Sequence, residues 1–270
     1  MKILILGDVV GNVGRIEIQK KLKKIIKENQ IDFTVLNGEN SAEDGRGITK
    51  SIAEEFFKND VDVITSGNHI WDKSEITEYI SKEKRLLRPE NLTQGSPGNG
   101  CGIFLSKSKN YKVAVINLMG NVFMRKTEDL FTAAKNLQRR IKLKQEADFI
   151  IIDVHAETTS EKMAIGHFFD GKATVVVGTH THIPSADTRI LDNGTAYQTD
   201  LGMCGDYKSV IGMNRDNSLK KFLKDSSAVR HYPAKGNATI SGLFVTASEE
   251  TGLALKIQPI ILGGSLEERI

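Results

Sequence analysis

Short runs of β-branched and other apolar residues alternate along this chain with longer segments whose apolar positions recur every three or four residues. The short runs predict buried β-strands, and the longer segments predict amphipathic α-helices. Strands are expected at 2–6, 33–36, 62–65, 101–106, 111–118, 149–154 and 173–177. Helices are expected at 15–29, 49–58, 128–143 and 158–169, the last beginning with a capping box of Thr158 and Glu161. This alternation is typical of parallel βαβ units.

The last third of the chain has a different pattern, in which hairpins follow the α/β units. Residues 189–199 predict a hairpin around Asp192-Asn193-Gly194, and residues 239–262 predict a second hairpin that turns near 249–252. A short helix is expected between them at 218–224. This order predicts an α/β fold with a mixed sheet or with two stacked sheets. Because no linker interrupts the chain, we expect a single domain over residues 1–270.

The composition is that of an ordinary globular protein, with 39% hydrophobic residues, 26% charged residues and a net charge of +3. The slight basic excess suits anionic ligands. No apolar run approaches the length of a membrane span, and the run at 3–6 is too short for a signal peptide. Cys101 and Cys204 form neither a disulfide framework nor a zinc motif. We therefore expect a cytoplasmic protein with no membrane partner.

Metal-binding side chains follow five of the expected strands, at the point where each strand ends. In an open α/β sheet, ligands bind beyond the carboxyl ends of the strands, so these side chains are expected to converge. Each has an ordinary alternative role as a helix cap, a turn residue or a hydrogen-bonded core histidine. Their occurrence at five strand ends favours a shared site. The candidates are Asp8, Glu39, Asn40, Asn68, His69, His155, His180 and His182.

The last two candidates lie two residues apart, just after Gly178. If the backbone there is extended, the rings of His180 and His182 point to the same side and can meet one metal site. His167 and His231 follow no strand, so we expect core or surface roles for them. The glycine-rich stretch at 98–102 is expected to be a plain loop, since it joins no strand to a helix.

The candidate ligands number three imidazoles, two carboxylates and two carboxamides when His69 is left aside. This is more than one tetrahedral zinc ion needs, and it suits two metal ions ~3.5–4 Å apart that share a carboxylate. Mixed nitrogen and oxygen ligands favour iron, manganese or zinc over magnesium or calcium. With only two carboxylates the site stays positive, so it should attract a phosphate. It should also lower the pKa of a bound water toward neutrality, which gives a hydroxide nucleophile.

Five motifs, in this order along the chain, resemble those of the calcineurin-like metallophosphoesterases, and above all their small bacterial YmdB-like branch. The motifs are Gly7-Asp8, Gly38-Glu39-Asn40, Gly67-Asn68-His69, a lone His155 and Gly178-Thr179-His180-Thr181-His182. The resemblance covers essentially the whole chain. It implies a four-layer α/β/β/α sandwich with mixed sheets and a dinuclear centre that often contains iron. It also implies phosphodiesterase activity toward 2′,3′-cyclic nucleotides.

The resemblance further implies a role for each matching residue. The ligands of metal one would be Asp8, Asn40 and His182. The ligands of metal two would be Asn68, His155 and His180, and Glu39 would bridge the two metals. His69 directly follows a ligand and would act beside the metals as a general acid. The wider superfamily usually has a histidine where this chain has Val10, and an aspartate where it has Glu39.

The sequence therefore predicts a dinuclear metallophosphodiesterase that acts on a small phosphodiester such as a cyclic nucleotide. A broader phosphatase or an RNase is the alternative within the enzyme class, so RNA stays open as a substrate. A regulatory RNA- or protein-binding module with a structural metal centre is the alternative from another class. Self-association into a homo-oligomer also stays open. Trp71 and Tyr207 could stack on a base or belong to the core.

Overall fold

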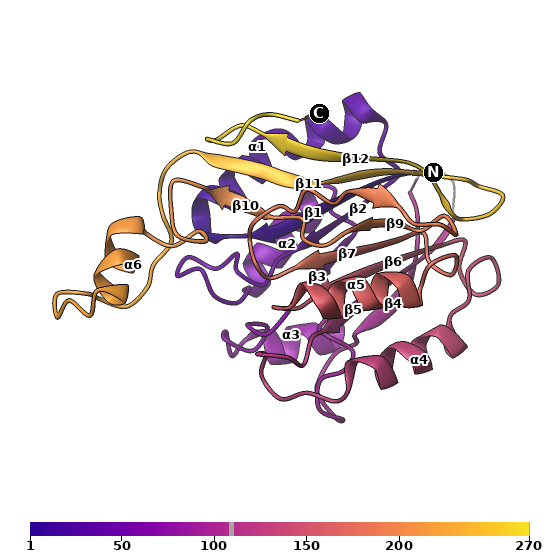
Figure 1. The fold of residues 1–270 in the computed structure, drawn as a ribbon, viewed down its shortest axis with the longest axis horizontal. Coiled ribbons are helices and arrows are strands. Elements are labelled where there is room, and N and C mark those ends of the chain that lie inside the picture. The colour runs from indigo at the N-terminus through magenta and orange to yellow at the C-terminus, as the bar shows by residue number, and fades with distance from the viewer. Residues whose placement is uncertain (108–110, 270) are drawn as a thin grey trace.

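The computed structural model describes residues 1–107 and 111–269, which form two six-stranded mixed sheets stacked on each other (Figure 1). The strand order of the first sheet is β12-β11-β10-β1-β2-β3. Strands β1, β2, β3 and β10 run parallel, and β11 and β12 form the antiparallel hairpin predicted at the end of the chain. The bounds are β1 Lys2–Val9, β2 Phe33–Asn37, β3 Val63–Thr65, β10 Met203–Asp206, β11 Ala238–Ala247 and β12 Ala254–Leu262.

The strand order of the second sheet is β4-β5-β6-β7-β9-β8. Its four central strands are parallel, and the edge strands β4 and β8 are antiparallel to their neighbours. The short hairpin predicted at 189–199 is thereby confirmed. The bounds are β4 Cys101–Leu105, β5 Lys112–Met119, β6 Phe149–His155, β7 Val175–Thr179, β8 Arg189–Ile190 and β9 Ala196–Gln198.

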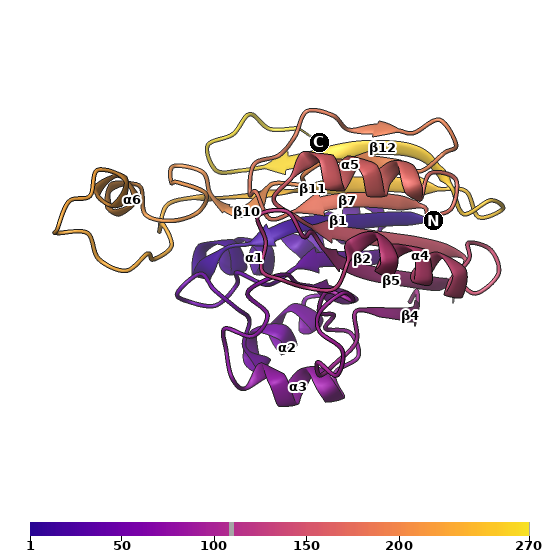
Figure 2. The same ribbon diagram turned by 60° about the horizontal axis from the view of Figure 1, so that its bottom comes forward.

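Helices cover the outer faces of the two sheets, and one helix projects away from the body (Figures 1 and 2). The helices on the first sheet are α1 Gly11–Asn29, α2 Lys50–Lys58 and α3 Ile76–Lys82, and those on the second are α4 Leu130–Arg140 and α5 Thr159–Phe168. Helix α6, Arg215–Phe222, lies on a projecting arm between β10 and β11. We call residues 207–237 the arm.

Three layers of buried apolar side chains hold this arrangement together, because each sheet face needs an apolar partner. The middle layer lies between the sheets and includes Ile5 and Val35 of the first and Val115 and Ile151 of the second. The outer layers join the first sheet to α1, α2 and α3, and the second sheet to α4 and α5. The predicted four-layer α/β/β/α sandwich is therefore confirmed.

Several local expectations need correction. Neither α3 nor β10 was expected from the sequence, α4 ends at Arg140 instead of 143, and α6 lies at 215–222 instead of 218–224. The capping box predicted at the start of α5 is not formed, because the side chain of Thr158 accepts no hydrogen bond from the first turn of the helix. The Thr158 hydroxyl donates to Glu161 Oε2 at 2.6 Å, while Oε1 accepts the backbone amides of Asn121 and Val122. Glu161 therefore holds the loop after β5 through hydrogen bonds and does not cap the N-terminus of α5.

Within residues 1–107 and 111–269, no helix is long and apolar enough to cross a membrane.

Candidate metal centre

The parallel strands of both sheets end at one edge of the sandwich, and the candidate residues meet there. Asp8 is near the end of β1, His155 ends β6, and the others lie in the loops that follow β2, β3 and β7. Gly67 allows this convergence. A Cβ atom at Gly67 would lie 2.1 Å from His155 Cδ2 and 2.5 Å from Glu39 Oε2. All eight residues predicted from the sequence are thus brought to one place.

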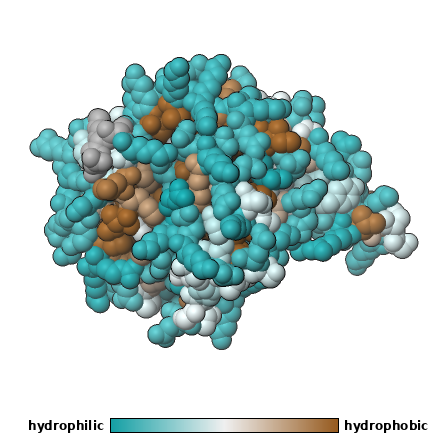
Figure 3. Space-filling view, turned by 180° about the vertical axis from the view of Figure 1, so that it is seen from behind, coloured by the Kyte–Doolittle hydropathy of each residue, from teal (hydrophilic) through white to brown (hydrophobic). Residues whose placement is uncertain are grey.

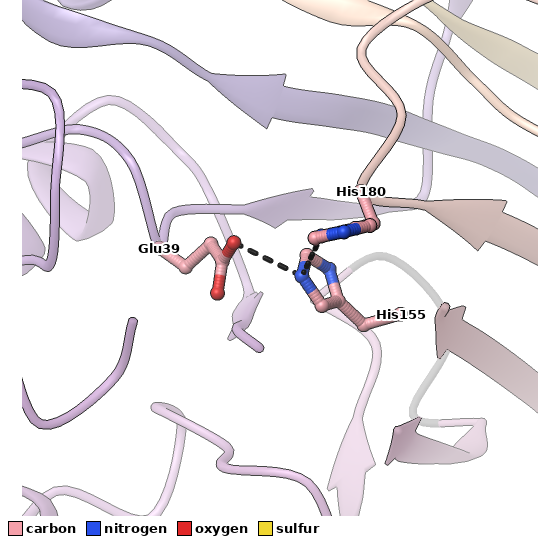
Figure 4. A group of neighbouring side chains, drawn as sticks. All are labelled: Glu39, His155 and His180. Atoms are coloured by element: carbon pink, nitrogen blue, oxygen red, sulfur yellow. Dashed lines mark hydrogen bonds and ion pairs between the residues drawn. The ribbon is translucent and has the colours of Figure 1, made fainter. Parts of the chain in front are cut away.

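Glu39, His155 and His180 form the tightest group, with one potential ligand atom of each within 4.8 Å of the others (Figure 4). His155 Nε2 lies 3.0 Å from Glu39 Oε1 and 3.0 Å from His180 Nδ1. Asn68 Oδ1 lies 3.1 Å from the same nitrogen. Ligand atoms bound at 2.0–2.1 Å and at right angles around one ion lie roughly 3 Å apart. The spacing of this group fits a single metal ion.

A second group, formed by Asp8, Asn40 and His182, adjoins the first through Glu39. Asn40 Nδ2 lies 3.2 Å from Glu39 Oε1 and 3.1 Å from His182 Nε2, and His182 Nε2 lies 3.8 Å from Asp8 Oδ1. Asp8 Oδ1 is buried without a hydrogen-bond partner among the described residues. A buried carboxylate oxygen of this kind is costly unless a cation satisfies it. Asn40 presents its nitrogen here, so binding a metal through oxygen requires a half-turn of its amide.

The loop that carries His180 and His182 is not extended, so the expectation that both rings point to the same side is wrong. Strand β7 continues through Gly178 to Thr179, and both histidines then have left-handed backbone conformations, with φ of 100° and 68°. The turn sends His180 Nδ1 toward His155 and His182 Nε2 toward Asn40. Such conformations cost about 1–3 kcal/mol each and persist only where the surroundings impose them. His180 consequently belongs to the group of Glu39 and His155, and His182 belongs to the group of Asp8 and Asn40.

Buried hydrogen bonds fix the rings of the imidazoles. His155 Nδ1 lies 2.9 Å from Thr179 Oγ1, which donates to Asp153 Oδ1 at 2.7 Å. His182 Nδ1 donates to the carbonyl oxygen of Ile211 at 2.8 Å. Partners of this kind orient a ligand and leave its other nitrogen for the metal. Sequence reasoning did not find Asp153, although a carboxylate inside the otherwise apolar run 149–154 was a usable signal.

Lys162 and Asp200 form a buried ion pair behind the loop of His180 and His182. Lys162 Nζ lies 2.7 Å from Asp200 Oδ2, and their side chains are 1% and 3% exposed. The same carboxylate oxygen accepts hydrogen bonds from the amide and the hydroxyl of Thr181, at 3.1 and 2.7 Å. Asp200 Oδ1 accepts the amide of Gly202, whose carbonyl accepts the amide of Asp8. The pair therefore positions the backbone of both ligand groups.

Replacing Lys162 by Met should lower the free energy of unfolding by about 3–5 kcal/mol, because it leaves the Asp200 carboxylate buried without its ion-pair partner. Chemical unfolding followed by circular dichroism measures the loss. Lys172→Met, at an exposed position, is the matched control and should change stability little. The double variant Lys162→Met/Asp200→Asn should recover part of the loss, and a Lys162→Met loss below about 1 kcal/mol would contradict the buried pair.

Burial and mutual charge shift the pKa values of the candidate ligands strongly. Burial raises the pKa of the Glu39 carboxyl, but the charge and hydrogen bond of His155 outweigh this and lower it to about 2. Burial lowers the pKa of His155, but Glu39, followed by Asp8, outweighs this and raises it to about 9. The pKa of Asp8 rises to about 6, mainly through burial. A proton on His155 thus balances the charge of the buried carboxylates.

Metal affinity should rise with pH between about 6 and 9, because a metal ion binds only the unprotonated imidazole of His155. Since the pKa of His155 is about 9 in the metal-free protein, its proton must leave throughout this range, and affinity should increase roughly tenfold per pH unit. Competition for Mn²⁺ against a chelator of known pH dependence measures the slope. An affinity independent of pH over this range would contradict the role of His155 as a ligand.

His69 lies beside both groups, and its side chain contacts a carboxylate. Its backbone amide donates to Glu39 Oε2 at 3.0 Å, and its Nδ1 lies 2.8 Å from Asp72 Oδ2. The contact with Asp72 fixes the ring and leaves Nε2 for a substrate. This arrangement suits a proton donor that sits next to the metals without binding them.

A cavity of about 410 Å³ opens over these residues and extends to the arm. Glu39, Asn40, His69, His180 and His182 line its inner part. The arm supplies the outer part, including His231, which sequence reasoning had placed outside the site. Glu157 also lines the cavity and reaches His180 Nε2 at 3.1 Å. Tyr207 lies outside this cavity lining, and its hydroxyl contacts the backbone of His182 and Met203.

Two stacked mixed sheets, with imidazoles, carboxylates and carboxamides gathered beyond their strand ends, define an enzyme of the calcineurin-like metallophosphoesterase class. Residues 4–260 match the model of the YmdB-like protein family, and the chain belongs to this family. It is 42% identical over 262 residues to the 2′,3′-cyclic-nucleotide 2′-phosphodiesterase of Bacillus subtilis (strain 168), with 97% of each chain covered. The resemblance seen in the sequence motifs is confirmed.

Solved structures of similar proteins share the whole fold. A phosphatase from Mycoplasma pneumoniae has a TM-score of 0.89 and 35% identity, with 97% of this chain and 93% of that chain covered. A protein of Thermus thermophilus has a TM-score of 0.88 and 33% identity, with 98% of this chain and 100% of that chain covered. The fold described above is thus shared with these two solved structures over nearly the full length.

Proposed function

We propose that this protein is a phosphodiesterase with two metal ions and that 2′,3′-cyclic nucleotides are its substrates. The observation that carries the proposal is the pair of ligand groups joined by Glu39 at the inner end of a cavity of about 410 Å³. Ligand pockets for small molecules typically have roughly 300–1,000 Å³. The activity named for the Bacillus subtilis relative supports the choice of substrate.

The residues present fit two metal ions. Asn68, His155 and His180 would hold one, Asp8, Asn40 and His182 would hold the other, and Glu39 would bridge them. The unpartnered Asp8 Oδ1 and the spacings of roughly 3 Å around His155 Nε2 support this division. Bound metals supply positive charge for the phosphate and lower the pKa of a water that acts as nucleophile. The donor set favours iron, manganese or zinc.

The protein's own residues supply the remaining parts of the reaction. His69, held through Nδ1 by Asp72, would protonate the oxygen that leaves phosphorus. The amide of His69 stays bonded to Glu39, so the proton donor and the bridging carboxylate keep a fixed relation. Thr179 and Ile211 hold the imidazoles in orientation. These contacts preorganise the site before a substrate enters.

A panel of substrates tests the proposal. The metal-loaded protein should hydrolyse 2′,3′-cyclic nucleotides with a higher kcat/KM than nucleoside 5′-monophosphates or single-stranded RNA. A higher value for the monophosphates would assign a phosphatase, and a higher value for RNA would assign an RNase. Metal-loaded protein that hydrolyses none of them but binds RNA would make it a binding module with a structural centre.

A further inference from the structure

The arm forms one wall of the cavity, and its base touches the candidate metal centre. Helix α6 projects from the body in Figure 1, yet the cavity is lined by Ile211 before it, Phe222 at its end and His231 after it. The carbonyl of Ile211 accepts the hydrogen bond of His182, and Val210, Met213 and Phe222 line the same cavity. A ligand whose phosphate sits at the metal ligands therefore extends toward the arm.

The arm has a defined internal structure. Asn217 lies on α6, and its Nδ2 donates a hydrogen bond to the carbonyl oxygen of Val229 at 3.1 Å. The backbone amide of Val229 donates in return to Asn217 Oδ1 at 2.9 Å. The amide of Asn214 donates to the carbonyl of Tyr232, and that of Ala234 to the carbonyl of Gly212. These bonds hold the two halves of the arm together. The wall that faces the metal centre is consequently preformed.

Two polar atoms of the arm are buried and have no hydrogen-bond partner among the described residues. They are Ser218 Oγ and His231 Nδ1, and both residues line the cavity. Ser218 is only 1% exposed. Burial, followed by the positive charges of Lys221 and Arg46, lowers the pKa of His231, which favours the neutral imidazole. A neutral donor or acceptor in the ligand would satisfy each of these atoms.

The apolar part of the same wall presents an aromatic ring to the cavity. Phe222 lines the cavity although it is 77% exposed, and Val210, Ile211 and Met213 continue the apolar surface. Figure 3 shows hydrophobic residues on the projecting arm, at the right of that view. An exposed aromatic ring next to unpartnered neutral polar atoms matches a flat heterocycle with a hydrogen-bonding edge. Arg46, from outside the arm, also lines the cavity.

We propose that the arm is the nucleobase subsite, in which Phe222 stacks on the base and Ser218 and His231 bind its edge. The inference rests on the proposed function, because it assumes that the phosphate lies at the metal ligands. It makes the arm the part of the protein that distinguishes a nucleotide from other cyclic phosphodiesters. Ser218 and His231 would then set the preference among bases, and Phe222 the affinity common to all of them.

The test compares two substrates that share a five-membered cyclic phosphodiester, adenosine 2′,3′-cyclic phosphate and glycerol 1,2-cyclic phosphate, which has no base. In Phe222→Ala the preference for the nucleotide, as the ratio of kcat/KM values, should fall roughly 10- to 100-fold, mainly through KM. Phe222→Trp should retain the preference. Leu223→Ala, on the neighbouring exposed residue that does not line the cavity, is the matched control and should also retain it.

Base selection is tested by Ser218→Ala, which should change the ratio of KM values among the four 2′,3′-cyclic nucleotides. Equal losses on both diesters in Phe222→Ala would overturn the subsite. So would a change of oligomeric state in Phe222→Ala with the nucleotide preference intact, which would assign the ring to a protein interface.

Binding of adenosine alone separates this inference from the proposed function. Calorimetry on the metal-loaded protein should show adenosine binding that Phe222→Ala weakens and Leu223→Ala does not. If the wild type hydrolysed neither diester but bound adenosine in this way, the phosphodiesterase proposal would fail and the subsite would stand. If it hydrolysed both diesters equally well and bound no adenosine, the subsite would fail and the phosphodiesterase proposal would stand.

Discussion

Replacing Glu39 by Gln should lower metal occupancy and turnover together, each by at least about 100-fold. The substitution keeps the shape of the side chain but removes the charge that would be shared by both metal ions. Loss of residues that only support a ligand typically costs roughly 10- to 100-fold in affinity or activity, so loss of the bridge should cost more. Metal analysis and hydrolysis of a 2′,3′-cyclic nucleotide measure the two quantities on the same preparation.

The matched control is Glu43→Gln, which removes an exposed carboxylate a few residues further along the same loop. It should leave both metal content and turnover near the wild-type values. Glu39→Gln should also keep its far-ultraviolet circular dichroism, because a single polar residue at the edge of the sheets contributes little to the three apolar layers. Near-normal activity of metal-replete Glu39→Gln would refute the bridge. Loss of the dichroism signal would make Glu39 a structural residue.

Replacing His69 by Ala should depress hydrolysis of a 2′,3′-cyclic nucleotide by about 10²–10⁴-fold and leave metal content unchanged. A nucleoside alkoxide is a poor leaving group that needs a proton as it departs, whereas a nitrophenolate leaves without one. Hydrolysis of bis-nitrophenyl phosphate should therefore fall much less. The backbone amide that donates to Glu39 remains in the variant, so the bridging carboxylate keeps that hydrogen bond.

Asp72→Asn is the companion variant, because it keeps the imidazole and weakens only the contact that orients it. Its loss on the cyclic nucleotide should lie between the wild type and His69→Ala. Equal losses of His69→Ala on both substrates, with full metal content, would remove the general-acid role. A loss of metal in His69→Ala would instead make His69 a ligand.

The layers of the fold were predictable because most strands and most helices have a clear apolar pattern. Strand β10 was missed because it consists of only Met203–Asp206, and α3 because it spans only seven residues. Helix α6 was misplaced because its arm carries exposed apolar residues, among them Phe222 and Leu223, and so lacks one buried face. The pattern of apolar residues in a sequence indicates which positions are buried. Where an element is only partly buried, this pattern does not determine at which residues the element begins and ends.

The meeting of the candidate ligands was predictable from one rule, that parallel strands present their carboxyl ends at one edge. The supporting contacts were not, because they join residues far apart in the chain. Asp153 accepts a hydrogen bond from Thr65, and Lys162 pairs with Asp200. No pattern within a short stretch of the sequence predicts contacts between residues so far apart in the chain. The left-handed backbone of His180 and His182 was also hidden, since non-glycine residues seldom adopt it.

The position of His231 in the cavity cannot be predicted from the residues next to it in the sequence. His231 follows no strand, so the rule that locates the other histidines does not place it in the site. The arm folds back so that its ring lines the cavity and its Nδ1 is buried. Only the packing of residues 207–237 against the body brings it there. A polar residue in an irregular segment therefore gives no sign of its position until the tertiary structure is known.

Stepwise metal loading of the metal-free protein tests the central claim most directly. Elemental analysis after each addition of Fe²⁺ under anaerobic conditions, or of Mn²⁺, gives the number of ions held per chain, and hydrolysis of a 2′,3′-cyclic nucleotide is followed on the same samples. We predict that two ions are retained per chain and that turnover appears as the second ion binds. Retention of a single ion at full activity, or activity without any retained metal, would contradict the dinuclear centre.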